Sequence, residues 1–186
     1  MLVLLIYVVF SFAVELFTLY LAFNRINNLW VLHIYTLMEF AFIVVIFSQY
    51  VEMIQYRKSV PMILILYSII WISSKIFLES FAEFDNYSSP PANILLILVA
   101  LRALYISGQA VEPTIWKMSF FWFSVAVLIK FVGDFTLFLF GEWFINLGLS
   151  DGISVWSIHW TINILSNIGF SLALLCPSQT SAPTGS

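Results

Sequence analysis

Charged residues are scarce in this chain of 186 residues, since Asp, Glu, Lys and Arg together make up only 9% of it. Soluble domains typically carry about a quarter charged residues, so this chain cannot surround an apolar core with a water-facing surface. Hydrophobic residues make up 62%, aromatic residues make up 18%, and the mean hydropathy is +1.01. This composition excludes an ordinary soluble domain and indicates that lipid is the main solvent of the protein.

Motifs for redox chemistry, metal-dependent hydrolysis and phosphate binding are also missing. Cys176 is the only cysteine, so the chain has neither an intrachain disulfide nor a CxxC pair. The patterns HExxH, HxxxH and ExxH do not occur, and there is no glycine-rich phosphate loop. The seven Lys and Arg residues are scattered and do not form a patch with aromatic residues, so nucleic acid is not an expected partner.

Six long apolar stretches are present instead, each near the length of about 20 residues that a helix needs to cross a bilayer. We therefore predict an all-α fold, a polytopic membrane bundle of six transmembrane helices that forms a single domain over residues 1–176. The tail 177–186 is rich in Ser, Thr, Pro and Gly and is expected to be disordered. The predicted helices cover about 2–23, 29–50, 59–79, 92–109, 112–140 and 153–176, with Pro61 in the first turn of the third helix.

The distribution of Lys and Arg between the loops predicts the orientation. Arg57, Lys58 and Lys117 lie in loops on one side of the predicted bundle, whereas Arg25 is the basic residue of the loops on the other side. Because cytoplasmic loops carry an excess of Lys and Arg, we expect both termini in the cytoplasm. The expected location is the plasma (inner) membrane.

Ionisable residues lie inside these apolar stretches. A charge at the centre of a bilayer costs roughly 2.5–3.5 kcal/mol on the insertion scale, so such residues usually face a partner, a cavity or a substrate path. With alternating helix directions, most of them fall in the outer half of the membrane, and we predict that they surround one polar cavity there. They are Glu15, His33, Glu39, Arg102, Lys130, Asp134 and His159, with Lys75 near the end of the third stretch.

Helical spacing places these residues on polar stripes, because residues three or four apart share a helix face. Examples are the series Tyr7, Ser11 and Glu15 and the series His159, Asn163 and Asn167. Stripes of this kind indicate helices that surround a shared polar interior. The candidate ligand-binding residues are Glu15, Glu39, Arg102, Lys130, Asp134, Asn163 and Asn167.

Purely structural roles compete with ligand binding at several of these positions. Lys130 and Asp134 are four residues apart and can form an ion pair within one helix. Asn163 and Asn167 can hold helices together by bonds worth roughly 1 kcal/mol each. We expect Lys75 to extend to the outer interface.

Arg102 lies near the predicted middle of its helix, so we expect it to pair with Glu15 or Glu39. Glu39 and His159 are stronger functional candidates, because neither has an obvious partner in its own helix.

The two histidines suggest a metal or a cofactor. His33 and His159 could join one carboxylate from another helix to hold zinc, with an open position that activates water. A haem held by both histidines and a retinal Schiff base on Lys130, with Asp134 as its counter-ion, are further alternatives. None of these rests on a recognisable ligand spacing.

Two classes of function remain open. In the first, the protein is a membrane binding module, a sensor or small transporter, that holds a proton or a small polar or cationic ligand in the outer-half cavity. In the second, it is an intramembrane zinc-dependent hydrolase that acts on lipid. The expected partners are the lipid bilayer and a small polar or ionic ligand, with a homo-oligomer or an attached cytoplasmic output domain as further expectations.

Overall fold

A computed structural model describes residues 1–50, 54–83, 85–108, 115–146 and 153–176, including the side chains of 1–50, 58–83, 85–108, 115–137 and 157–176. Within these ranges the chain contains helices and no strands. One short 3-10 helix, η1 (Ile115–Lys117), precedes the fifth long helix. The long helices are α1 (Leu2–Phe23), α2 (Leu29–Tyr50), α3 (Ile54–Phe77), α4 (Ser89–Gly108), α5 (Ser119–Asn146) and α6 (Ile153–Leu175).

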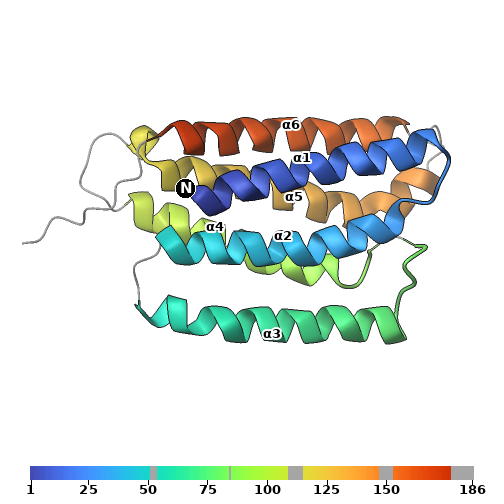
Figure 1. Cartoon of the computed structure of the whole chain (residues 1–186), viewed down its shortest axis with the longest axis horizontal. Coiled ribbons are helices and arrows are strands. Elements are labelled where there is room, and N and C mark those ends of the chain that lie inside the picture. The colour runs from blue at the N-terminus through green and yellow to red at the C-terminus, as the bar shows by residue number, and fades with distance from the viewer. Residues whose placement is uncertain (51–53, 84, 109–114, 147–152, 177–186) are drawn as a thin grey trace, which may run out of the picture.

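All six long helices are long and apolar enough to cross a membrane, which confirms the predicted fold class of a multi-pass helical bundle. Consecutive helices run in opposite directions, so α1 begins at the same end of the bundle at which α6 ends (Figure 1). The side of the membrane to which this end belongs stays a prediction from the Lys and Arg distribution. The tail 177–186 lies outside the described residues.

The helices are not packed equally. The most extensive contacts join α5 to its two neighbours α4 and α6, whereas α2 contacts α1, α3 and α4. Helix α3 lies at the edge of the bundle, beside α2 (Figure 1). Helix α1 packs on its sequence neighbour α2 and on the last helix, α6. This arrangement brings α1, α2, α5 and α6 around a common interior.

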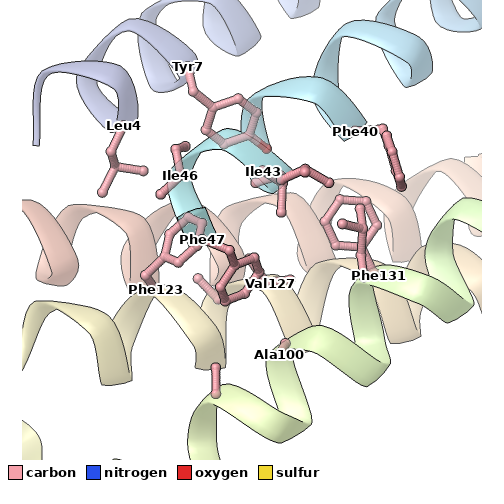
Figure 2. Close-up of a cluster of buried hydrophobic side chains, with 14 of the residues drawn as sticks. Leu4, Tyr7, Phe40, Ile43, Ile46, Phe47, Ala100, Phe123, Val127 and Phe131 are labelled. Atoms are coloured by element: carbon pink, nitrogen blue, oxygen red, sulfur yellow. The ribbon is translucent and has the colours of Figure 1, made fainter. Parts of the chain in front are cut away.

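The apolar core is formed mainly by side chains of α2, α4 and α5. Phe47 of α2 packs on Phe123 of α5 with their ring centroids 4.9 Å apart, and Val127 lies beside them, as Figure 2 shows. Tyr7 of α1 is fully buried in this core and packs edge-on against Phe170 of α6. The core therefore fixes the rotation of these helices and the direction in which Tyr7 presents its hydroxyl.

Large apolar side chains cover the outside of the bundle in the described ranges. Phe12 and Leu16 of α1 and Ile65 and Ile69 of α3 are examples, each more than half exposed. Such side chains suit a lipid environment, where the backbone is satisfied within each helix and apolar groups face hydrocarbon. The outward surface is thus consistent with the composition, and the polar residues are free to gather inside.

The predicted bounds of the first two helices are confirmed, but the third, fourth and fifth helices differ from the prediction. Helix α3 begins at Ile54, so Pro61 lies inside it and not in its first turn. Helix α4 begins at Ser89, because Pro90 and Pro91 fit the first turn of a helix, where no N–H is needed. Helix α5 begins at Ser119, after η1, and continues to Asn146.

Candidate functional site

Polar side chains gather in two separate clusters. The first, the central network, joins α1, α2, α5 and α6 inside the bundle. The second, the loop cluster, joins α2 and α3 to the connection between α3 and α4. The central network consists of Tyr7, Ser11, Glu15, Tyr35, Glu39, Lys130, Asp134, His159 and Asn163. The loop cluster consists of His33, Lys75, Glu79, Asp85 and Ser88.

Glu39 is the buried carboxylate to which two tyrosines converge. Its Oε1 accepts hydrogen bonds from the hydroxyls of Tyr7 at 2.8 Å and Tyr35 at 2.6 Å. Because the hydroxyl hydrogen of Tyr35 is committed to Glu39, the Ser11 hydroxyl 2.6 Å away donates to Tyr35. Two helices, α1 and α2, thus supply donors to one carboxylate oxygen.

Lys130 is the cation at the centre of the network. Its ammonium lies 3.4 Å from Oδ2 of Asp134 and 3.5 Å from Oε1 of Glu39, and it donates to Oδ1 of Asn163 at 3.0 Å. The Lys130 side chain is almost completely buried. A buried charge requires partners of this kind, since an uncompensated one is strongly destabilising. The predicted pair of Lys130 and Asp134 is therefore present, and two other helices contribute to it.

Asn163 connects the lysine to the edge of the bundle between α1 and α6. Its amide nitrogen donates to Oε1 of Glu15 at 2.9 Å and lies 3.0 Å from Nε2 of His159. An amide nitrogen can only donate, so Nε2 of His159 accepts and the ring proton sits on Nδ1. That Nδ1 lies 3.4 Å from Oδ1 of Asp134, an oxygen that accepts no hydrogen bond within the described part of the chain.

The edge formed by Glu15 and His159 is the accessible side of the network. Glu15 is exposed, and 29% of the His159 side chain is exposed, whereas Glu39 and Lys130 are buried. The contacts through Lys130 and Asn163 therefore connect the buried carboxylate of Glu39 to the exposed carboxylate of Glu15.

The loop cluster surrounds a second lysine. The ammonium of Lys75 lies 2.5 Å from Nδ1 of His33, donates to Oγ of Ser88 at 3.0 Å, and pairs with Oε1 of Glu79 and with Oδ1 of Asp85 at 3.3 Å. Only 4% of this lysine side chain is exposed. The expectation that Lys75 reaches the outer interface is wrong, because four acceptors hold its ammonium inside the protein.

Asp85 fixes the start of α4 as well as the lysine. Its Oδ1 accepts hydrogen bonds from the backbone N–H of Ser89 at 3.0 Å and from the hydroxyl of Ser88. Burial alone would raise the pKa of the Asp85 carboxyl, but the neighbouring His33 and Ser88 side chains and the charge of Lys75 outweigh burial and lower the pKa to about 2. Asp85 is therefore a stable carboxylate at the N-terminus of a helix, where negative charge is favoured.

The structure brings together most of the predicted site residues, but not all of them. Glu15, Glu39, Lys130, Asp134 and Asn163 belong to the central network. Asn167 is exposed on α6, and its side chain contacts no member of the network within the described residues.

Arg102 is also exposed, on α4, and pairs with no described residue, so the expected pair with Glu15 or Glu39 is wrong. It lies six residues before Gly108, the last residue of α4, so its long side chain can extend toward the membrane surface.

The two histidines lie in different clusters. His33 contacts Lys75 and Asp85, whereas His159 contacts Asn163 and Asp134. The arrangement that a zinc site with both histidines or a haem between them would need is therefore not seen in these contacts.

Sequence reasoning missed the partners of His33. Glu79 ends the third predicted helix and Asp85 lies between the third and fourth predicted helices, although Glu79 follows Lys75 by four residues, a spacing that favours an ion pair. Asp85 offers no such signal, because only the path of the loop brings it to His33. No protein-family model, curated protein or solved structure matches this chain.

Proposed function

We propose that this multi-pass membrane protein is a binding module, a sensor or small transporter, whose central network takes up a proton or a small cation. The proposal depends on one observation, the surplus of acidic groups over basic groups around Lys130. Six helices that can span a membrane place this surplus in an apolar surrounding, where charge is expensive.

The charge balance can be counted from the contacts. Glu15, Glu39 and Asp134 contribute three negative formal charges, and Lys130 contributes one positive charge, which leaves −2 when the histidine is neutral. Protonated His159 would reduce the surplus to −1. In a medium of low dielectric such a surplus is relieved by binding a proton or a cation. Uptake of one positive charge is therefore the reaction that the network favours.

Exchange with the surroundings would take place at the edge between α1 and α6. Glu15 and His159 are the exposed members, and both contact the amide nitrogen of Asn163, whose amide oxygen accepts from Lys130. Nδ1 of His159 lies 3.4 Å from Oδ1 of Asp134, which suits an imidazole that passes a proton toward this carboxylate. Both a sensor and a transporter could use this exchange. A measurement of ion flux across a vesicle membrane distinguishes the two, because only a transporter moves the ion across.

The alternative of a zinc-dependent hydrolase has weaker support. It needs two histidines and a carboxylate on one metal, and the contacts of His33 and His159 belong to different clusters. Binding of a proton or a monovalent cation does not require both histidines at one site.

The proposal is tested by thermal unfolding of the detergent-purified protein across a range of pH values and in Na⁺, K⁺ and ammonium salts. Wild-type protein should show a melting temperature that depends on pH or on one cation. In Glu39→Gln this dependence should shrink or disappear, because the amide keeps the shape and can still accept from Tyr7 and Tyr35 but cannot ionise.

Glu83→Gln is the matched control, because Glu83 is an exposed carboxylate outside the network and its removal should leave the dependence intact. If Glu39→Gln matches wild type across the whole screen, the proposal is wrong. Should Glu39→Gln fail to fold, Asp134→Asn provides the same comparison, since Asp134 belongs to the same charge surplus.

A further inference from the structure

We propose that the loop cluster is a binding site for a divalent transition metal of the zinc class, held by His33, Glu79 and Asp85, with Lys75 as a displaceable internal cation. Each of the three residues offers one ligand atom, and these three atoms lie within 4.8 Å of one another. All three residues are buried. One imidazole nitrogen and two carboxylate oxygens form a donor set that suits zinc or a similar first-row metal.

The orientation of His33 is the first support for this site. Its Nε2 lies 2.9 Å from the backbone carbonyl oxygen of Glu83, which can only accept, so Nε2 carries the proton. The neutral ring then presents the lone pair of Nδ1 to the cluster. Metal-binding histidines are commonly fixed in this way by a hydrogen bond from the other ring nitrogen to a carbonyl.

The second support is a carboxylate oxygen without a hydrogen bond. Oδ2 of Asp85 is buried and accepts no hydrogen bond among the described residues, and it lies 3.6 Å from Nδ1 of His33. Oδ1 of the same residue is engaged by Ser88 and by the N–H of Ser89, which holds the carboxylate in place. A fixed carboxylate with one oxygen left over is suited to coordinating a cation.

Formal charge is the third support. Glu79 and Asp85 contribute −2, and Lys75 returns only +1, so the cluster with neutral His33 retains a charge of −1. A divalent cation in place of the ammonium would neutralise the two carboxylates completely. The loop cluster therefore carries more negative charge than Lys75 neutralises.

The lysine also has room to leave. A surface hollow of about 470 Å³ adjoins the cluster, and both Lys75 and Glu79 line it. The remaining lining residues belong to the same segment, 75–81. A flexible lysine side chain can turn into this hollow while a metal ion takes its place among the three ligands. None of these residues belongs to the central network, so the site is independent of the function proposed above.

The test is zinc binding by the purified full chain, measured by calorimetry and by elemental analysis after gel filtration, in a Cys176→Ser background. Lys75→Met removes the competing ammonium and should bind one zinc ion about tenfold or more tightly than the parent, because a like charge is gone from the site. Adding His33→Gln to Lys75→Met should weaken zinc binding by about 100-fold, as expected when a metal site loses a ligand or its support.

His159→Gln in the same Lys75→Met chain is the matched control, since His159 is the other histidine and lies outside the cluster. Its zinc affinity should equal that of Lys75→Met. Absence of stoichiometric zinc in Lys75→Met, or zinc binding that survives His33→Gln, overturns the proposal. Should Lys75→Met not fold, the zinc-dependent rise in melting temperature of the Cys176→Ser parent is compared with and without His33→Gln, and an equal rise in both overturns the proposal.

Discussion

Buried charge dominates this protein at the scale of single residues. Lys130 has contacts with side chains from two other helices, and Lys75 has contacts with His33 of α2 and with three residues between α3 and α4. Each lysine lies opposite at least two carboxylates. Each ammonium group therefore connects side chains from several parts of the chain. Removal of either ammonium group should reduce stability more than the loss of any single hydrogen bond.

Lys130→Met should destabilise the protein by about 3–5 kcal/mol, because Glu39 and Asp134 would keep their buried charges without a cation. The free energy of unfolding in mixed detergent micelles measures the effect. Lys58→Met is the control, since Lys58 is exposed and the same change there should cost much less. Equal losses in the two variants would contradict the role assigned to Lys130.

At the scale of the helices, α5 and α6 approach closely at two glycines. A Cβ at Gly169 would lie 2.8 Å from Cβ and 3.2 Å from Cα of Ala126, and a Cβ at Gly133 would lie 2.5 Å from a methyl carbon of Ile162. Small residues permit such approaches between membrane helices, where van der Waals packing drives association. This close packing holds Asn163 and Lys130, which lie on these two helices, within hydrogen-bond distance.

Gly169→Ala should therefore destabilise the bundle by about 1–3 kcal/mol, because the backbone of α5 at Ala126 must shift. Thermal unfolding in detergent provides the measurement. Gly108→Ala is the matched control, since a Cβ at Gly108 meets nothing within 4 Å. A melting temperature of Gly169→Ala that equals that of Gly108→Ala would show that the approach of the two helices is not tight.

At the scale of the whole molecule, the alternating helix directions place the loop cluster at one end of the bundle and the beginning of α1 at the other (Figure 1). If both termini are cytoplasmic, the loop cluster faces the outside of the cell. A metal site there would meet extracytoplasmic ions, and the edge at Glu15 and His159 would lie within the outer half of the membrane.

Cysteine labelling in intact cells tests this orientation. In a Cys176→Ser background, Glu83→Cys should react with a membrane-impermeant maleimide, whereas Lys117→Cys should react only after the membrane is permeabilised, because the side of the bundle that also carries Arg57 and Lys58 stays inside. Both positions are exposed, so access of the reagent is not limited by burial. The opposite pattern would invert the orientation and move the loop cluster to the cytoplasmic side.

The sequence alone predicted the six helices and the bounds of α1 and α2, because apolar length and short polar breaks are local properties. It was less accurate where prolines are involved, since Pro90 and Pro91 were read as part of a loop although they lie inside the first turn of α4. Helical spacing also indicated that Lys130 and Asp134 are paired, and their contact is 3.4 Å.

The partners across helices could not be predicted in this way, because they depend on how far each helix is rotated about its axis. Asn163 and Asn167 share a predicted face, but four residues turn a helix by about 40° beyond one full turn and advance it by about 6 Å. That difference leaves Asn163 in the network and Asn167 exposed.

The sequence by itself determined that this protein lies in a membrane as six helices with costly charges inside, since composition and apolar length decide both. Only the tertiary structure divided those charges into two clusters. It placed His33 with Asp85, 52 residues further along the chain, and His159 with Asp134, on a neighbouring helix. Contacts of this kind arise from helix packing and loop paths, which no local pattern encodes, and they assign seven of the eight ionisable residues to specific sites and leave Arg102 outside them.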